Sequence, residues 1–137
     1  MSELVTAPAS AAAVAAALAH GGGFVETGVE ASPALVEAVA GGALGVALTT
    51  AQAYRLPLAS LLRAAALRHF GITYDSRLAL EVSLQEALAN AIVHGNLTIG
   101  ATEGLDERFA RIEAGLADPV RSALRVEATL ALLADGS

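Results

Sequence analysis

Apolar residues recur at helical spacing through three stretches in the second half of the chain. These stretches run from Pro57 to Phe70, from Asp75 to Gly95 and from Leu105 to Leu116. Side chains three or four positions apart share one face of a helix, so the pattern predicts three amphipathic helices. Gly71 follows the first stretch and Asp118-Pro119 follows the third, and both are typical of helix ends.

After Pro119 the apolar spacing changes to a period of two. Between Leu124 and Leu132 apolar residues alternate with polar ones, which predicts a half-buried strand. Two shorter runs, 24–29 and 44–50, are rich in β-branched residues and lie between turn residues, so they predict two further strands. Helices and strands together indicate an α+β fold, and 137 residues allow one domain.

The N-terminal part of the chain is rich in alanine and glycine. Ser10 can cap a helix over Ala11–Ala19, in which Val14 and Leu18 are the only sizeable apolar side chains. Alanine buries little area, so we expect this helix to pack weakly, as a loosely docked arm. A second short helix is expected to begin at Pro33.

The last residues form an unusual ending for a domain. Asp135-Gly136 is a strong signal for a two-residue hairpin, yet only Ser137 follows it. The strand at 124–132 would then lack a partner on one side, and an apolar edge of that kind invites aggregation. Either this strand pairs only with earlier elements, or the natural domain continues beyond this chain, which is the alternative we expect.

The composition excludes several classes of chemistry. The chain has no cysteine, which excludes disulfides, thiolate catalysis and cysteine-zinc sites. All eight basic residues are arginine, so lysine Schiff bases are excluded as well. The net charge of −6 argues against nucleic acid or an anionic membrane as the main partner.

Targeting and membrane signals are weak. The apolar run at 11–19 is preceded by Glu3 and by no basic residue, whereas a secretory signal begins with positive charge. No window approaches the ~20 strongly apolar residues that a membrane span needs. We therefore expect a cytoplasmic protein.

The stretch from Leu80 to Leu97 carries two polar stripes on a helical wheel. An apolar stripe formed by Leu80, Leu84, Leu88 and Ala91 is the expected core face. Glu81, Gln85 and Asn96 lie beside it and are expected to face solvent. A second polar stripe consists of Ser83, Glu86, Asn90 and His94. One solvated face does not explain both stripes, so we expect the second one to line a pocket.

Glu86 and Asn90 are the candidate chemical pair within that stripe. Residues four apart on a helix meet at about 6 Å. The Asn carboxamide oxygen is a hard ligand that suits Mg²⁺, and the Glu can deprotonate a hydroxyl that attacks a phosphoryl group. Spacing alone is weak, because Glu and Asn also meet in this way on many solvated helices.

The longer context of this pair resembles a known family. The run from Leu84 to Asn96 matches the pattern E-A-x-x-N-A-x-x-H-G at Glu86, Ala87, Asn90, Ala91, His94 and Gly95. This pattern resembles the N-box helix of the GHKL (histidine-kinase-like) ATPases, and it is closest to the anti-sigma-factor serine kinases. The resemblance covers residues 44–137, so residues 1–43 would be an N-terminal extension with a short strand and helix.

The resemblance implies a fold, cofactors and partners. The fold would be an incomplete Bergerat-type α/β sandwich, with helices on one face of a mixed sheet and without the C-terminal strands and ATP lid. By position, Glu86 would be the general base, Asn90 would bind Mg²⁺ and His94 would lie near the bound ATP. The partner would be a sigma factor or an anti-anti-sigma protein phosphorylated on serine, and homodimers are common in this branch.

One departure from the family is serious. Its adenine-recognising D-x-G-x-G box occurs nowhere in this sequence. We therefore expect the magnesium and base half of a nucleotide site without its adenine half, and a chain that is inactive alone. The alternatives are a non-catalytic partner-binding module derived from the same fold, and a structural helical domain with a chance match.

Overall fold

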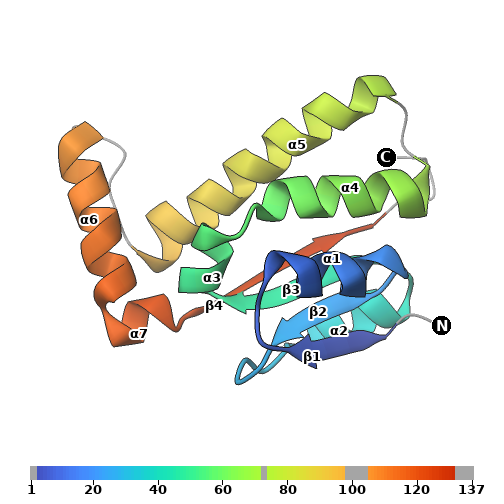
Figure 1. Ribbon diagram of the computed structural model, residues 1–137, viewed down its shortest axis with the longest axis horizontal. Helices are drawn as coiled ribbons and strands as arrows, with labels where there is room; N and C mark the ends of the chain where they lie inside the picture. Colours follow the sequence, from blue (N-terminus) through green and yellow to red (C-terminus); the bar gives the residue numbers. More distant parts are fainter. Residues whose placement is uncertain (1–2, 72–73, 98–104, 132–137) are drawn as a thin grey trace.

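A computed structural model describes residues 3–71, 74–97 and 105–131 (Figure 1). Four strands form one sheet, and helices pack against it in an α+β arrangement. In chain order the elements are β1 (Leu4–Ala7), α1 (Ala11–Ala19), β2 (Gly23–Glu26), α2 (Pro33–Ala40), β3 (Leu44–Thr49), α3 (Thr50–Arg55), α4 (Leu58–Phe70), α5 (Tyr74–Ala89), the π-helix η1 (Asn90–Asn96), α6 (Leu105–Ala117), α7 (Pro119–Ser122) and β4 (Arg125–Leu130).

The sheet is mixed and has the strand order β1-β2-β3-β4. The first three strands are parallel, whereas β4 runs antiparallel to β3, with Val46 opposite Ala128. The strands predicted from Phe24, from Leu44 and after Pro119 are therefore confirmed. The turn predicted at Asp135-Gly136 lies outside the described residues.

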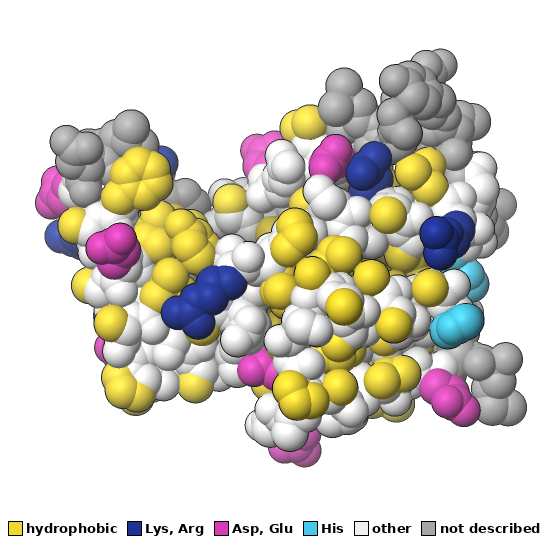
Figure 2. All heavy atoms as spheres, in the orientation of Figure 1, with side chains coloured by type: hydrophobic (Ala, Val, Ile, Leu, Met, Phe, Trp, Pro, Cys, Tyr) yellow, Lys and Arg dark blue, Asp and Glu magenta, His cyan; other side chains and the backbone are white. Residues whose placement is uncertain are grey.

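The main core lies between the sheet and α1, α3, α4, α5 and η1, and Ile112 of α6 belongs to the same cluster. Phe24 of β2 and Leu48 of β3 are fully buried in it. Val14 and Leu18 of α1 are also buried, and α1 packs beside α4. The expectation of a loosely docked arm was wrong, because the many alanines of α1 let its backbone approach the neighbouring helix closely. Figure 2 shows that the outer surface over α1 is mostly hydrophobic or uncharged.

The opposite face of the sheet is covered by α2. Leu35 and Val39 of α2 form a second, smaller core with Val25 of β2 and Ala47 of β3. The expectation that helices cover one face only was therefore wrong, because α2 buries its apolar stripe on the other side. Gly45 permits this close packing, since a Cβ there would lie 2.6 Å from Leu35 Cδ1.

The two crossover connections of the parallel strands have opposite hands. The strands β1, β2 and β3 follow one another in order, while α1 and α2 lie on opposite faces (Figure 1). Two right-handed crossovers advancing in one direction would put both helices on the same face. One of these short connections is therefore left-handed, which is rare in parallel sheets.

The three amphipathic helices predicted from the spacing of apolar residues are present as α4, α5 and α6. Gly71 ends α4 in the left-handed conformation with φ 65°, which favours glycine. Asp118 follows α6 as expected, but it also begins the short helix α7, which the sequence analysis missed. Its carboxylate accepts a hydrogen bond from the Val120 N–H at 2.9 Å, and Pro119 occupies the first helical position.

Within the three described segments, no helix is long and apolar enough to cross a bilayer.

Replacing Leu18 with alanine tests whether α1 is an integral part of the core. Leu18 is 1% exposed, so the variant should lower the free energy of unfolding, measured by urea denaturation. We expect a loss of about 2–5 kcal/mol, because the truncated side chain leaves a cavity. Val36→Ala is the control, since Val36 of α2 is 46% exposed and should change stability by less than about 0.5 kcal/mol. Equal effects of the two substitutions would contradict this packing.

Candidate functional site

The candidate site residues lie where α5 continues into η1. Leu80, Leu84 and Leu88 pack against the main core as the apolar stripe predicts, whereas Ala91, the fourth member of that stripe, is exposed. Glu86 and Asn90 are both exposed, one helical turn apart, with Asn90 opening η1. The structure therefore brings these two side chains onto one solvent-facing surface. The backbone of His94 belongs to η1, but its side chain lies outside the described residues.

The described members of the second polar stripe do not line the cavity that the structure shows beside this helix. Ser83, Glu86 and Asn90 are exposed and do not line the cavity that adjoins this helix. That cavity, of about 320 Å³, lies against Gln85 and its helical neighbours, where solvent was expected. The reason is the turn between α3 and α4, which approaches α5 from that side and leaves a gap beside it.

Two residues expected to face solvent instead hold the helix in place. Glu81 accepts a hydrogen bond from the Ser60 hydroxyl of α4 at 2.8 Å, and its carboxylate lies 3.7 Å from Arg63 Nε. At the other end, the Asn96 carboxamide donates to Thr50 Oγ1 at 2.8 Å and to the Arg125 carbonyl at 3.3 Å. Both ends of the helix are thus tied to neighbouring elements by side-chain contacts.

The π-helical segment η1 explains how Asn96 reaches these partners. The Leu97 N–H donates to the Ile92 carbonyl, five residues earlier, at 2.9 Å. A π turn is wider than an α turn, so each residue advances less around the helix axis. The wider turn lets Ile92 and Leu97 enter the core while Asn96 points toward α3 and β4. Such π segments are often found at functional sites.

Thr50 joins three elements at this point. It is fully buried, and its hydroxyl donates to the Leu124 carbonyl at 2.7 Å while accepting from Asn96. Its backbone N–H donates to the same carbonyl at 2.8 Å. The start of α3, the chain entering β4 and the end of η1 are therefore fixed by one residue.

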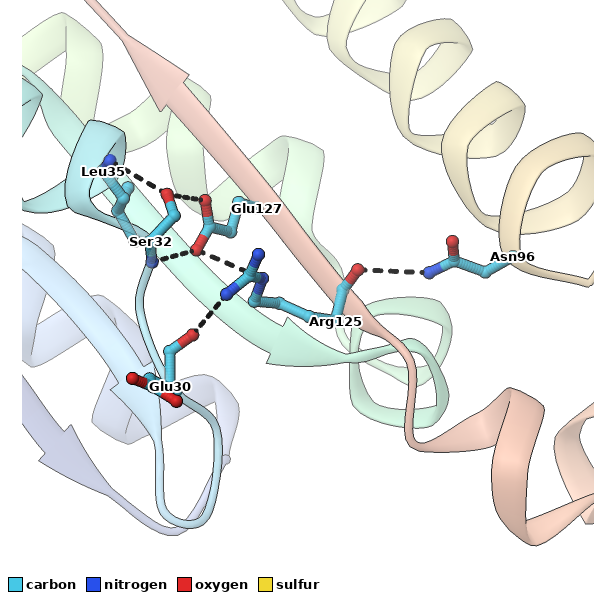
Figure 3. A network of polar contacts seen from close by, with 6 residues as sticks. All are labelled: Glu30, Ser32, Leu35, Asn96, Arg125 and Glu127. Carbon is cyan, nitrogen blue, oxygen red and sulfur yellow. Dashed lines mark hydrogen bonds and ion pairs between the residues drawn. The ribbon is translucent and has the colours of Figure 1, made fainter.

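Polar contacts continue from Asn96 across the sheet to α2 (Figure 3). Arg125 of β4 donates to the Glu30 carbonyl at 2.7 Å, and its Nε lies 3.5 Å from the Glu127 carboxylate. Glu127 accepts from the Ser32 N–H at 2.7 Å, at the beginning of α2. Glu127, one of the polar residues of the alternating run 124–132, is therefore partly buried and in contact with the beginning of α2.

The donor chemistry of the Glu86–Asn90 pair fits Mg²⁺ held together with a phosphate. Mg²⁺ prefers oxygen ligands, keeps several waters and usually takes only one or two protein groups. The described part of the chain offers no metal site made of protein ligands alone. It contains no group of three or more His, Cys, Asp or Glu side chains that could hold a metal. An ion at this pair would therefore take its remaining ligands from water or from a bound phosphate.

Comparisons with known proteins do not identify the chain. No protein-family model, curated protein or solved structure matches it. The interpretation of the site therefore rests on its own residues and their geometry.

The role of Thr50 and the cavity beside Gln85 were not predicted from the sequence. The pair Thr49-Thr50 after an apolar run was a signal for a helix start at this point, because threonine favours the beginning of a helix. The Thr49 hydroxyl does accept a hydrogen bond from the Gln52 N–H, at 3.4 Å, at the start of α3. The cavity had no comparable signal, because it forms between segments that lie far apart in the chain.

Replacing Thr50 with valine tests the anchoring of η1. The variant keeps the shape of the side chain but removes the partner of Asn96 and a donor to Leu124. We expect a loss of about 1–3 kcal/mol in the free energy of unfolding, since buried polar groups are left unpaired. Hydrogen exchange of the backbone amides at 92–97 should also accelerate. Thr50→Ser keeps the hydroxyl and is the control; faster exchange in Thr50→Ser alone would contradict the assignment.

Proposed function

We propose that this chain is part of an ATP-binding regulatory protein of the GHKL class, resembling the anti-sigma-factor serine kinases. The observation that carries the proposal is the exposure of Glu86 and Asn90 on one surface, at the transition from α5 to η1. The rest of that helix is anchored by core contacts and by Asn96. A rigid helix with a free carboxylate and a free carboxamide is suited to receiving a metal-bound phosphate group.

The two side chains have different roles in this proposal. Asn90 would contribute its carboxamide oxygen to Mg²⁺, which when bound neutralises phosphate charge. Glu86 would accept the proton of an attacking serine hydroxyl on a partner protein, such as an anti-anti-sigma protein. His94 would lie near the nucleotide, one turn beyond Asn90.

An alternative is a non-catalytic module that binds a protein partner through the same fold. Large apolar side chains on α6 and α7 favour it, since Phe109 is 54% and Val120 73% exposed. Aromatic side chains such as Phe109 are found at protein interfaces more often than on free surfaces. In a binding module, substituting both Phe109 and Val120 with serine should abolish binding to the partner protein. Glu86→Ala should leave that binding unchanged.

Manganese-ATP provides a test of the phosphate-binding surface. Because the D-x-G-x-G box is absent, we expect this chain alone to bind nucleotide very weakly. Paramagnetic broadening still reports weak complexes, so the backbone amide signals at 86–91 should broaden with Mn²⁺-ATP more than with Mn²⁺ alone. Asn90→Ala should remove that difference.

Gln85→Ala is the matched control for this experiment, because Gln85 is exposed on the other side of the same helix. Equal loss of broadening in the two variants would contradict the role of Asn90. Micromolar affinity for Mg²⁺-ATP, measured by calorimetry on the unmodified chain, would contradict the expected weak binding.

Glu86→Ala tests the proposed phosphoryl transfer. The test uses a protein that contains both these residues and a D-x-G-x-G box. In it, Glu86→Ala should abolish phosphoryl transfer to serine and retain nucleotide binding, because only the proton acceptor is removed. Asn90→Ala should instead weaken Mg²⁺-ATP binding itself. Rates from a phosphate-transfer assay and affinities from calorimetry separate the two effects. Equal loss of both properties in both variants would indicate misfolding instead of chemistry.

A further inference from the structure

The cavity beside α5 lies on a different face of the helix from the proposed site, since neither Glu86 nor Asn90 lines it. One wall is a stripe of α5 and η1 residues at helical spacing, from Gln85 to Val93. The other wall is the turn between α3 and α4, with Tyr54 and the first residues of α4. Its volume of about 320 Å³ is at the small end of the range of natural ligand pockets.

Among the described residues that line this cavity, none carries a charged side chain. Most of the lining is aliphatic, including Leu56, Leu88 and Ile92. A charged molecule would lose its hydration there without gaining a partner of opposite charge, so the lining selects an uncharged, largely apolar occupant.

Three lining residues can orient such an occupant. Gln85 is exposed and offers both a donor and an acceptor. The Ser60 hydroxyl uses its proton on Glu81, so its oxygen remains available to accept a hydrogen bond. Tyr54 is 41% exposed, and within the described segments the one close pair of rings joins His69 and Phe70, so the Tyr54 ring is free to stack.

We propose that this cavity binds a small, planar, uncharged aromatic molecule that carries a hydrogen-bonding group. An engineered cavity of about 150 Å³ holds benzene, so this volume admits a bicyclic ring system. Ile92 and Val93 of η1 form part of the wall, so an occupant stabilises the π-helical form of η1 that begins at Asn90. An effect on nucleotide chemistry at Asn90 rests on the proposed function, whereas binding in the cavity does not.

Titration of the isotope-labelled chain with indole tests this proposal without metal or nucleotide. Indole is uncharged, planar and bicyclic, and its N–H can donate to Gln85. We expect saturable shifts of the backbone amide signals at 53–56, 58–60 and 85–93, together with slower hydrogen exchange at 92–97. Shifts that do not saturate, or that centre on other residues, would overturn the proposal. Unchanged exchange at 92–97 in the saturated complex would overturn the effect on η1.

Two leucine substitutions on α5 provide matched variants. Ala89 and Ala87 are both exposed, but Ala89 lines the cavity and Ala87 does not. Ala89→Leu should weaken indole binding at least tenfold by occupying the space, and Ala87→Leu should leave the affinity unchanged. Gln85→Leu keeps the cavity and should weaken binding about fivefold, the typical effect of one hydrogen bond. Indole affinity that survives Ala89→Leu would overturn the proposed location.

Discussion

The buried hydroxyl of Thr50 is the interaction on which the arrangement of the candidate site depends. It connects the end of β3 with the chain entering β4 and with the end of η1. A buried hydroxyl is stable only when its hydrogen bonds are made, so these three segments can occupy only a narrow range of relative positions. The orientation of α5, and with it the placement of Glu86 and Asn90, follows from this contact together with the contacts of Glu81 and of the leucine stripe.

Contacts of β4 extend this limit on relative positions to the other face of the sheet. The Arg125 carbonyl accepts from Asn96, and the Arg125 guanidinium donates to the Glu30 carbonyl in the loop before α2. Glu127 accepts from the Ser32 N–H at the beginning of α2. Because α2 covers a different face from α1, the sheet is packed on both sides around β3, whose first five residues are all buried. Such a strand has little freedom to shift its register, which keeps Thr49 and Thr50 where α3 must begin.

The sequence predicted the elements with strong periodicity and missed those that depend on tertiary contacts. The helices α4 and α6 and the strand β4 were predicted because their apolar residues repeat regularly over many positions. The π-helical form of η1 has no signal in the local sequence. The run from Asn90 to Asn96 predicts an ordinary α-helix, and only the contact of Asn96 with Thr50 indicates a different form. The spacing of Glu86 and Asn90 correctly predicted that they share one face of the helix. The sequence could not predict which face lies beside the cavity, because that depends on the position of the α3–α4 turn.

The antiparallel pairing of β4 with β3 also has a consequence for folding. The three parallel strands are joined by short crossovers, whereas the β3–β4 pair closes a loop that contains every residue from 50 to 124. The entropy of closing a loop grows with its length, and contacts distant in sequence slow folding. The hydrogen bonds from Thr50 to Leu124 and from Asn96 to Arg125 require β4 in place. The register of the π-helix is therefore set only after this long loop has closed.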